Sequence, residues 1–312
     1  MAVDRNSHIS PMISIIMTAY NCVQYIEEAI QSILKQTFRD FEFIIIDDGS
    51  TDRTKERIIE FKDPRIKFYS LDHVGRARAL NFAVGKAQSP YIAFMDADDI
   101  SMPERIEKQY NFLQQNQNIG IVSNWYQLID TSGKQLNIFR KLPECHAQIE
   151  NEMTIHCSMC FPAAMTSRKL LNQIGGFNAD LQSAVDYDLF LRLLPITKLY
   201  NIQEMLFQHR ILSSSISASR SNEQRYYTLK LANNYLKNCL EQSHSIGEKR
   251  KIYFRLGLTE YYHGTMHTAR RWFICAIPSQ WTQWQIWRYF IATFLGDRFF
   301  VLFRKLVHEY SL

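Results

Sequence analysis

The sequence predicts an α/β fold in which a mostly parallel sheet is flanked by helices and followed by an all-helical extension. Two observations support this prediction. Between residues 12 and 100, apolar runs typical of strands alternate with helical patterns, an order that produces parallel strands with helices on both faces. From about residue 222 onward the pattern is helical throughout. Hydrophobic residues make up 46% of the 312 residues, which is ordinary for a globular protein.

The elements of the first part follow from the spacing of their apolar residues. Ile26, Ala29, Ile30 and Ile33 share one helical face, whereas the run 41–46 is short and apolar, as in a buried strand. We expect strands at 12–19, 41–46, 66–71, 91–95 and 119–129. We expect helices at 25–36, between the polar run 47–52 and about residue 61, and at 77–87, 103–115 and 186–194.

The composition changes after the serine run 213–215, where helical spacing takes over. Helices are expected at 226–241, 249–262 and 268–277. The pattern within 255–276 is similar to one tetratricopeptide-type helical hairpin, and a single hairpin favours a packing role over a peptide-binding array. We therefore place a domain boundary between residues 217 and 218, giving domains at 1–217 and 218–312.

Charge and hydropathy exclude several classes of protein. Lys and Arg number 36 against 31 Asp and Glu, a net charge of +5, which is well short of the basic excess typical of nucleic-acid binding. No run of about 20 apolar residues without charge is present, so no membrane-spanning helix is expected. Residues 1–11 lack the apolar run of a signal peptide, and the six cysteines are scattered. We therefore expect a cytoplasmic protein with reduced cysteines.

Acidic residues cluster after two of the predicted strands. Asp47 and Asp48 follow the second strand, and Asp96, Asp98 and Asp99 follow the fourth. In parallel sheets, ligands bind outside the carboxyl ends of the strands. Carboxylates brought together repel one another, and a divalent cation that prefers hard oxygen ligands, Mn²⁺ or Mg²⁺, relieves this repulsion. The alternative for each cluster taken singly is that its aspartates cap the following helix.

A third acidic site lies at the start of the helix predicted at 186–194. Asp186 begins this helix, where the helix dipole stabilises a carboxylate. Asp188 and Arg192 stand four residues apart, the spacing of a helical ion pair. Asp186 is therefore expected to stay ionised, and Asp188 is either a surface charge or the partner of Arg192.

Seven motifs in order along the chain point to one family. They are 14–21 (SIIMTAYN), 44–52 (IIIDDGSTD), 75–81 (GRARALN), 91–99 (YIAFMDADD), Met102-Pro103 with Arg105, Gly175-Gly176-Phe177, and 186–192 (DYDLFLR). In sequence and spacing they resemble the family 2 glycosyltransferases, which are inverting enzymes of the GT-A fold. The resemblance covers about residues 12–217. It implies a Rossmann-like catalytic domain with a nucleotide-binding half at about 12–100 and an acceptor half at about 101–217.

The resemblance implies where a nucleotide diphosphate sugar binds. Thr18, Ala19 and Tyr20 line the nucleoside pocket, with the Tyr20 ring against the base. Asp48 accepts a hydrogen bond from a ring nitrogen of uracil or thymine, so UDP- or dTDP-sugars are the expected donors.

The resemblance also implies a metal site and a diphosphate contact. Asp96 faces the ribose and the metal, and Asp98 ligates Mn²⁺ or Mg²⁺ directly. Arg76 or Arg78 approaches the diphosphate, to which a guanidinium can bind with two parallel hydrogen bonds. The alternative for both arginines is a solvated helix face.

On the acceptor side, the resemblance assigns the general base to Asp186. Many relatives carry a glutamate before this aspartate, and here the residue is Val185. His156 falls where some relatives have a histidine near the acceptor cleft, with a buried structural histidine as the alternative.

The expected activity is transfer of a single sugar to a saccharide or lipid-linked acceptor in cell-surface polysaccharide or glycolipid synthesis. Processive synthases add membrane helices and a glutamine-x-x-arginine-tryptophan motif, and here Thr268 stands three residues before Arg271-Trp272. One alternative is an inactive scaffold of the same fold. Another is a phosphohydrolase with aspartates at strand ends, although Asp96-Ala97-Asp98-Asp99-Ile100 lacks the threonine or valine expected after the second aspartate of such a loop.

The C-terminal segment 281–306 mixes aromatic and aliphatic residues with basic ones. This composition suits a helix at the interface of an anionic membrane, which would make the protein peripheral on the inner face of the plasma membrane. The alternative is a helix that packs on the catalytic domain.

Overall fold

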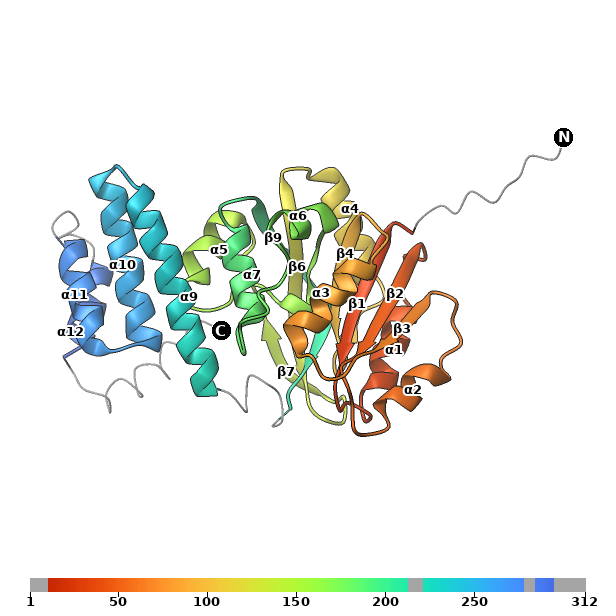
Figure 1. The fold of residues 1–312 in the computed structure, drawn as a ribbon. Helices are drawn as coiled ribbons and strands as arrows, with labels where there is room; N and C mark the ends of the chain where they lie inside the picture. The colour runs from red at the N-terminus through yellow and green to blue at the C-terminus, as the bar shows by residue number, and fades with distance from the viewer. Residues whose placement is uncertain (1–10, 213–220, 278–283, 295–312) are drawn as a thin grey trace. The chain divides into compact units, whose positions relative to one another are not determined.

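The computed structural model describes residues 11–212, 221–277 and 284–294. Contacts within the chain divide them into two compact units, whose elements are labelled in Figure 1. The first unit comprises the described residues up to Cys145 together with Met159–Leu212, and the second comprises His146–Ser158 and the described residues after 220. The domain boundary predicted between residues 217 and 218 lies outside the described residues and stays a prediction.

The described residues of the first unit form a nine-stranded sheet. Every strand predicted from periodicity is present, with ends that differ by at most one residue, and four further strands were not predicted. The strands are β1 (Ile13–Ala19), β2 (Phe41–Asp47), β3 (Ile66–Ser70), β4 (Tyr91–Asp96), β5 (Ile100–Ser101), β6 (Ile119–Ile129), β7 (Gln135–Arg140), β8 (Met165–Ser167) and β9 (Lys198–Arg210).

The strand order places a switch point beside β1. The sheet runs β3-β2-β1-β4-β8-β6-β9-β5, with β7 paired to β6. Strands β3, β2, β1 and β4 are parallel, as predicted. β8 is antiparallel to β4 and β6, and β5 is antiparallel to β9, so the second half of the sheet is mixed. The chain goes outward from β1 to β3 and returns to form β4 on the other side of β1, and ligands bind at such reversals of strand order.

Helices cover both faces of the parallel strands (Figure 1). Ile15 and Met17 of β1 face a core that includes Ile30 and Ile58, whereas α3 packs against β1 and β2 from the opposite side. The helical elements of this unit are α1 (Ile26–Leu34), α2 (Thr54–Glu60), α3 (Arg76–Lys86), α4 (Arg105–Gln115), the 3₁₀ turn η1 (Phe161–Ala163), α6 (Arg168–Gln173) and α7 (Val185–Leu193).

The described residues of the second unit form helices joined by short connections. The helices predicted at 226–241, 249–262 and 268–277 are present, whereas the helix at His146–Met153 was not predicted. Two successive helices, 246–263 and 266–276, pack closely where Gly257 meets Phe273. A Cβ at Gly257 would lie 2.4 Å from the ring of Phe273, so only glycine permits this close packing. The helices are α5 (His146–Met153), α9 (Ser221–Gln242), α10 (Ile246–His263), α11 (Met266–Ala276) and α12 (Trp284–Ala292).

Among the described residues, none of the helices has the length and apolarity needed to cross a membrane. Of the segment 281–306 predicted to lie at a membrane interface, only residues 284–294 are described. The rest of that prediction falls outside the described residues.

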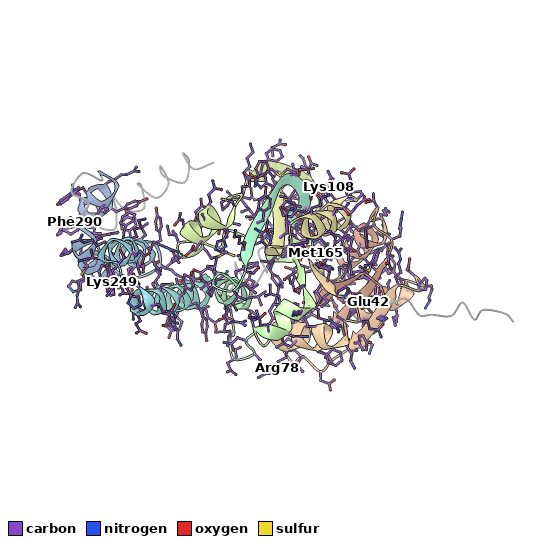
Figure 2. The ribbon with its side chains drawn as sticks, turned by 90° about the horizontal axis from the view of Figure 1, so that it is seen from above. Glu42, Arg78, Lys108, Met165, Lys249 and Phe290 are labelled. Carbon is purple, nitrogen blue, oxygen red and sulfur yellow. The ribbon has the colours of Figure 1, made fainter. Side chains whose placement is uncertain are left out.

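A buried carboxylate joins the parallel strands at the edge away from their carboxyl ends. Glu42 of β2, labelled in Figure 2, is 3% exposed. It accepts hydrogen bonds from Ser14 Oγ (2.5 Å) and Gln88 N (2.7 Å), and it pairs with Lys67 Nζ (2.6 Å). Burial raises the pKa of the Glu42 carboxyl, but these partners outweigh it and the pKa is lowered.

We expect Glu42→Gln to lower the free energy of unfolding by about 1–3 kcal/mol at pH 7, because a charged hydrogen-bond acceptor is lost. The pKa of Glu42 is lower in the folded chain, so its contribution is complete above the unfolded pKa and disappears as the pH falls through the folded pKa. Urea unfolding at neutral and acid pH measures this effect, with the exposed Glu60→Gln as the control. An equal loss at both pH values would contradict the prediction.

Candidate functional site

The predicted donor residues gather at the carboxyl ends of β1, β2 and β4. The strand register pairs Thr18 with Asp96 and Ala19 with Asp47. Residues 18–20, 47–48 and 96–99, which are far apart in the chain, are thereby brought to one edge of the sheet. This edge flanks the switch point beside β1, as expected for a ligand site.

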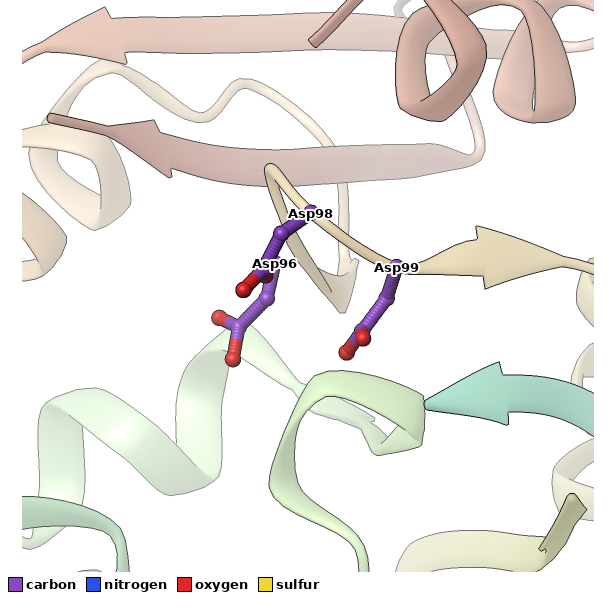
Figure 3. Close-up of side chains that lie close together, drawn as sticks. All are labelled: Asp96, Asp98 and Asp99. Atoms are coloured by element: carbon purple, nitrogen blue, oxygen red, sulfur yellow. The ribbon is translucent and has the colours of Figure 1, made fainter. Parts of the chain in front are cut away.

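Three carboxylates form a compact group after β4. One oxygen from each of Asp96, Asp98 and Asp99 lies within 4.8 Å of the others, and Figure 3 shows the three side chains extending to the same side of the loop. Burial and the charges of Asp99 and Asp96 raise the pKa of the Asp98 carboxyl to about 7. The fold therefore holds negative charge together at a cost, which a bound divalent cation would offset. A set of carboxylate oxygens fits Mn²⁺ or Mg²⁺.

Asp99 is fully buried and is held by the end of β9. Its carboxylate accepts hydrogen bonds from His209 Nδ1 (3.1 Å) and from the backbone N–H of Arg210 (2.8 Å). Burial lowers the pKa of His209, but the neighbouring Asp99 carboxylate outweighs this and raises it to about 9. Sequence reasoning missed His209 and Arg210, because they lie more than a hundred residues from the aspartates and in no motif that was recognised.

The two candidate arginines of α3 have different environments. Arg76 Nη2 donates to Asp96 Oδ1 at 2.7 Å. Burial lowers the pKa of Arg76, but the charges of Asp96 and Asp186 raise it above its ordinary value. Arg78, labelled in Figure 2, is exposed and donates to the Val74 carbonyl (3.4 Å). The structure therefore brings Arg76, and not Arg78, to the carboxylates.

Asp48 organises the loop that leads into α3. Its carboxylate accepts hydrogen bonds from the backbone N–H groups of Val74 (2.7 Å) and Gly75 (3.0 Å), and the residue is only 4% exposed. Gly75 has φ 90°, a conformation that favours glycine. Asp48 thus binds the loop before α3 instead of capping the helix that follows it. Each carboxylate oxygen has a second lone pair, so capacity for a further donor remains.

Tyr20 lies at the rim of the site with about half of its surface exposed. The His73 ring stacks on it, with ring centroids 4.3 Å apart and planes at 27°. His73 Nδ1 is also 3.0 Å from the backbone oxygen of Asp48. Tyr20 and Asp48, both predicted to contact the nucleoside, are therefore linked through His73, which sequence reasoning did not single out.

Asn21 connects the loops after β1 and β2. Its side-chain oxygen accepts hydrogen bonds from the N–H groups of Thr51 (2.8 Å) and Asp52 (3.4 Å), and its own N–H donates to Ser50 Oγ (3.0 Å). Asn21 has φ 51°, which asparagine tolerates better than most residues. These bonds hold the loop at the end of segment 14–21 and the loop at the end of segment 44–52 in a fixed position relative to each other.

Asp186 and Asp188 differ at the start of α7. Asp188 is buried and accepts a hydrogen bond from Arg192 Nε (2.8 Å). Arg192 also donates to the Ile174 and Gly176 carbonyls, both at 2.8 Å, and so holds the preceding loop. Asp186 is half-buried in the first turn of the helix, and its charge acts on Arg76. Asp188 therefore has a structural partner, whereas Asp186 is electrostatically linked to the carboxylate group.

His156 belongs to the second unit. Its Nε2 lies 3.2 Å from Glu152 Oε2, and its side chain is 58% exposed. It is therefore not the buried structural histidine of the alternative. Its predicted place on the acceptor side stays a prediction.

Comparisons with known proteins agree on one family. Residues 14–175 match the model of glycosyl transferase family 2. An uncharacterized glycosyltransferase of Methanocaldococcus jannaschii is 34% identical over 234 residues, which cover 70% of this chain and 79% of that relative. The O-antigen biosynthesis glycosyltransferase WbnJ of Escherichia coli is 34% identical over 222 residues, covering 68% of this chain and 84% of the relative.

Solved structures share the fold at lower identity. S. aureus TarS (residues 1–349) superposes with a TM-score of 0.60 at 19% identity, covering 86% of this chain and 81% of that one. The mannosyltransferase PcManGT of Pyrobaculum calidifontis, in complex with GDP-Man and Mn²⁺, gives 0.58 at 16% identity, covering 92% and 86%. These likenesses confirm the predicted GT-A-type fold. With its motifs at the carboxyl ends of the parallel strands, the chain belongs to glycosyl transferase family 2 and is a glycosyltransferase.

Proposed function

We propose that this glycosyltransferase moves one sugar from a nucleotide diphosphate donor to an acceptor hydroxyl with inversion at the anomeric carbon. The observation that carries the proposal is the compact group of Asp96, Asp98 and Asp99 beside the switch point, which Arg76 links electrostatically to Asp186. The complexes of TarS with UDP-GlcNAc and of PcManGT with GDP-Man and Mn²⁺ support a nucleotide-sugar donor. The family assignment argues against the phosphohydrolase alternative.

The base of the donor is expected against Tyr20, with Asp48 accepting a hydrogen bond from a ring N–H. Uracil and thymine present such a group, whereas adenine has no ring N–H. UDP- or dTDP-sugars are therefore the favoured donors, and TarS with UDP supports this choice. Guanine also carries a ring N–H, which keeps GDP-sugars as the second candidate. The remaining acceptor capacity of the Asp48 carboxylate is what this contact requires.

Asp96 and Asp98 would hold the divalent cation. Asp99 is engaged on both oxygens by His209 and Arg210, so we assign it to supporting the loop. When bound, the cation supplies neutralising positive charge for the diphosphate as it leaves. Arg76 lies beside Asp96 and can donate hydrogen bonds to oxygens of the diphosphate.

The reaction needs one proton acceptor and no enzyme nucleophile. The acceptor oxygen forms a bond to the anomeric carbon while the bond from that carbon to the diphosphate oxygen breaks. Asp186 accepts the hydroxyl proton, and the nucleoside diphosphate departs with the electron pair of the broken bond. A single displacement of this kind inverts the anomeric configuration. The helix N-terminus favours the charged carboxylate that proton abstraction requires.

The acceptor is expected to be a saccharide or a lipid-linked saccharide. The likeness to an O-antigen biosynthesis enzyme supports a role in cell-surface polysaccharide synthesis. We also propose that His156 lies on the acceptor side. The proposal further includes a cytoplasmic location and contact of the C-terminal segment with anionic membrane.

Donor choice can be tested by competition. Protein incubated with Mn²⁺ and a panel of sugar nucleotides should release UDP or dTDP fastest, and free UDP or dTDP should compete better than GDP, with ADP weakest. The physical reason is the ring N–H that Asp48 requires. Best competition by ADP would contradict the Asp48 contact. Release of no nucleotide with any donor and acceptor would favour the inactive scaffold.

Asp98→Asn should weaken Mn²⁺-dependent donor binding by at least about tenfold and leave the fold intact, because a ligand charge is lost while its volume is kept. Donor titration with and without Mn²⁺, together with a thermal melt, measures both effects. Asp72→Asn removes the same charge from an exposed position and serves as the control. Unchanged affinity and turnover in Asp98→Asn would remove this residue from the metal site.

Asp186→Asn should reduce turnover by about 10²- to 10⁴-fold, the usual effect of losing a general base, while donor and Mn²⁺ affinity stay nearly normal. Asp188→Asn should instead lower the melting temperature, since Arg192 loses its buried partner, with turnover of the folded protein reduced far less. The exposed Asp180→Asn controls for charge. Equal losses of turnover in the variants at 186 and 188, or a loss of donor binding in Asp186→Asn, would place the base elsewhere.

A further inference from the structure

We propose that Arg210 is a positioning residue that holds the aspartate loop, residues 96–99, in the conformation that binds the cation. The inference rests on the proposed metal site and assigns a role to a residue outside every motif of the sequence. Arg210 ends β9 and is buried, with its side chain 1% exposed. A buried arginine is costly unless its donors are satisfied, so the identity of its partners indicates what it holds.

Arg210 contacts the aspartate loop with both its backbone and its side chain. Its N–H donates to Asp99 Oδ1 (2.8 Å), and its Nε donates to the Asp98 backbone oxygen (2.7 Å). The side chain thus binds the loop through a peptide oxygen and takes up none of the carboxylate oxygens of Asp98. Positive charge is supplied to the loop while the oxygens suited to the cation are left in place.

The other end of the guanidinium is anchored on two further elements. Nη2 donates to Glu28 Oε2 of α1 (2.6 Å), and Nη1 donates to the Asp130 backbone oxygen in the turn between β6 and β7 (3.0 Å). The guanidinium carbon also lies 4.9 Å from the centre of the Tyr25 ring. The planar fork of an arginine can bind in three directions at once, which the single ammonium group of a lysine cannot reproduce.

This arrangement explains how three adjacent carboxylates stay together before a cation binds. Their like charges repel one another, which favours an open loop. Arg210 ties the loop to α1 and to the β6–β7 turn, so the loop backbone cannot open without breaking these bonds. A site held in its binding geometry loses less free energy to ordering when the cation binds.

The test measures Mn²⁺ binding directly. Calorimetric titration of Mn²⁺ into the full chain, with and without UDP, should show Arg210→Lys about 10- to 100-fold weaker than the parent, the usual effect of losing a residue that orients metal ligands. Turnover at saturating Mn²⁺ should fall much less than the affinity. Arg65→Lys is the matched control, because Arg65 also joins separate elements through Asp63 and the Leu34 carbonyl, far from the loop in sequence and sheet position. It should leave Mn²⁺ affinity unchanged.

Glu28→Gln keeps Arg210 and removes only its outer anchor, so it tests the proposal if Arg210→Lys fails to fold. Glu28→Gln should also weaken Mn²⁺ binding, by a smaller factor than Arg210→Lys. If Arg210→Lys folds, normal Mn²⁺ affinity in that variant would overturn the proposal. If Arg210→Lys does not fold, normal Mn²⁺ affinity in Glu28→Gln would overturn it. A parent protein that binds Mn²⁺ but transfers no sugar, with weakened binding in the variants, would support the role of Arg210 while contradicting the proposed function.

Discussion

The repulsion among Asp96, Asp98 and Asp99 is the constraint on which the site depends. Parallel strands place loops at a common edge of the sheet, and this chain fills that edge with carboxylates. Such a cluster persists only if its surroundings supply positive charge and fixed hydrogen bonds. Two separate elements meet this need: α3 supplies Arg76, and β9 supplies His209 and Arg210. The mixed second half of the sheet therefore supplies side chains that hold the aspartate loop at the end of the parallel half.

The parallel half of the fold could be predicted because its information is local. Strand β2 is apolar along its length, as in a fully buried strand, and helix α1 has apolar residues on one face only. Asn21, in the motif 14–21, accepts a hydrogen bond from Thr51, in the motif 44–52. The strands that were not predicted lack such a signal. β5 and β8 have two and three residues, too few for a period, and β9 alternates only imperfectly between buried and exposed positions.

The same difference separates the site residues that could be predicted from those that could not. Asp48, Asp98 and Asp186 lie in motifs that resemble those of one family, and the resemblance implies a candidate role for each. His209 and Arg210 acquire their roles only because β9 pairs with β5, which places their backbone next to the aspartate loop. His73 was missed for a related reason, since its stacking on Tyr20 depends on the loop conformation that Asp48 imposes.

Two arginines contact the aspartate loop in different ways. Arg76 is partly exposed and binds a carboxylate oxygen of Asp96 directly, so it competes with anything else that seeks that oxygen. In the proposed reaction, Asp96 would help to hold the cation, and the Arg76 guanidinium beside it would donate to the diphosphate, where positive charge is needed as the bond to the sugar breaks. Arg210 is buried, and its side chain reaches the aspartate loop through the Asp98 backbone oxygen, so a ligand on the carboxylates of Asp96 and Asp98 does not compete for that hydrogen bond. In the proposed mechanism, Arg76 can therefore exchange Asp96 for the diphosphate while Arg210 keeps the loop in place.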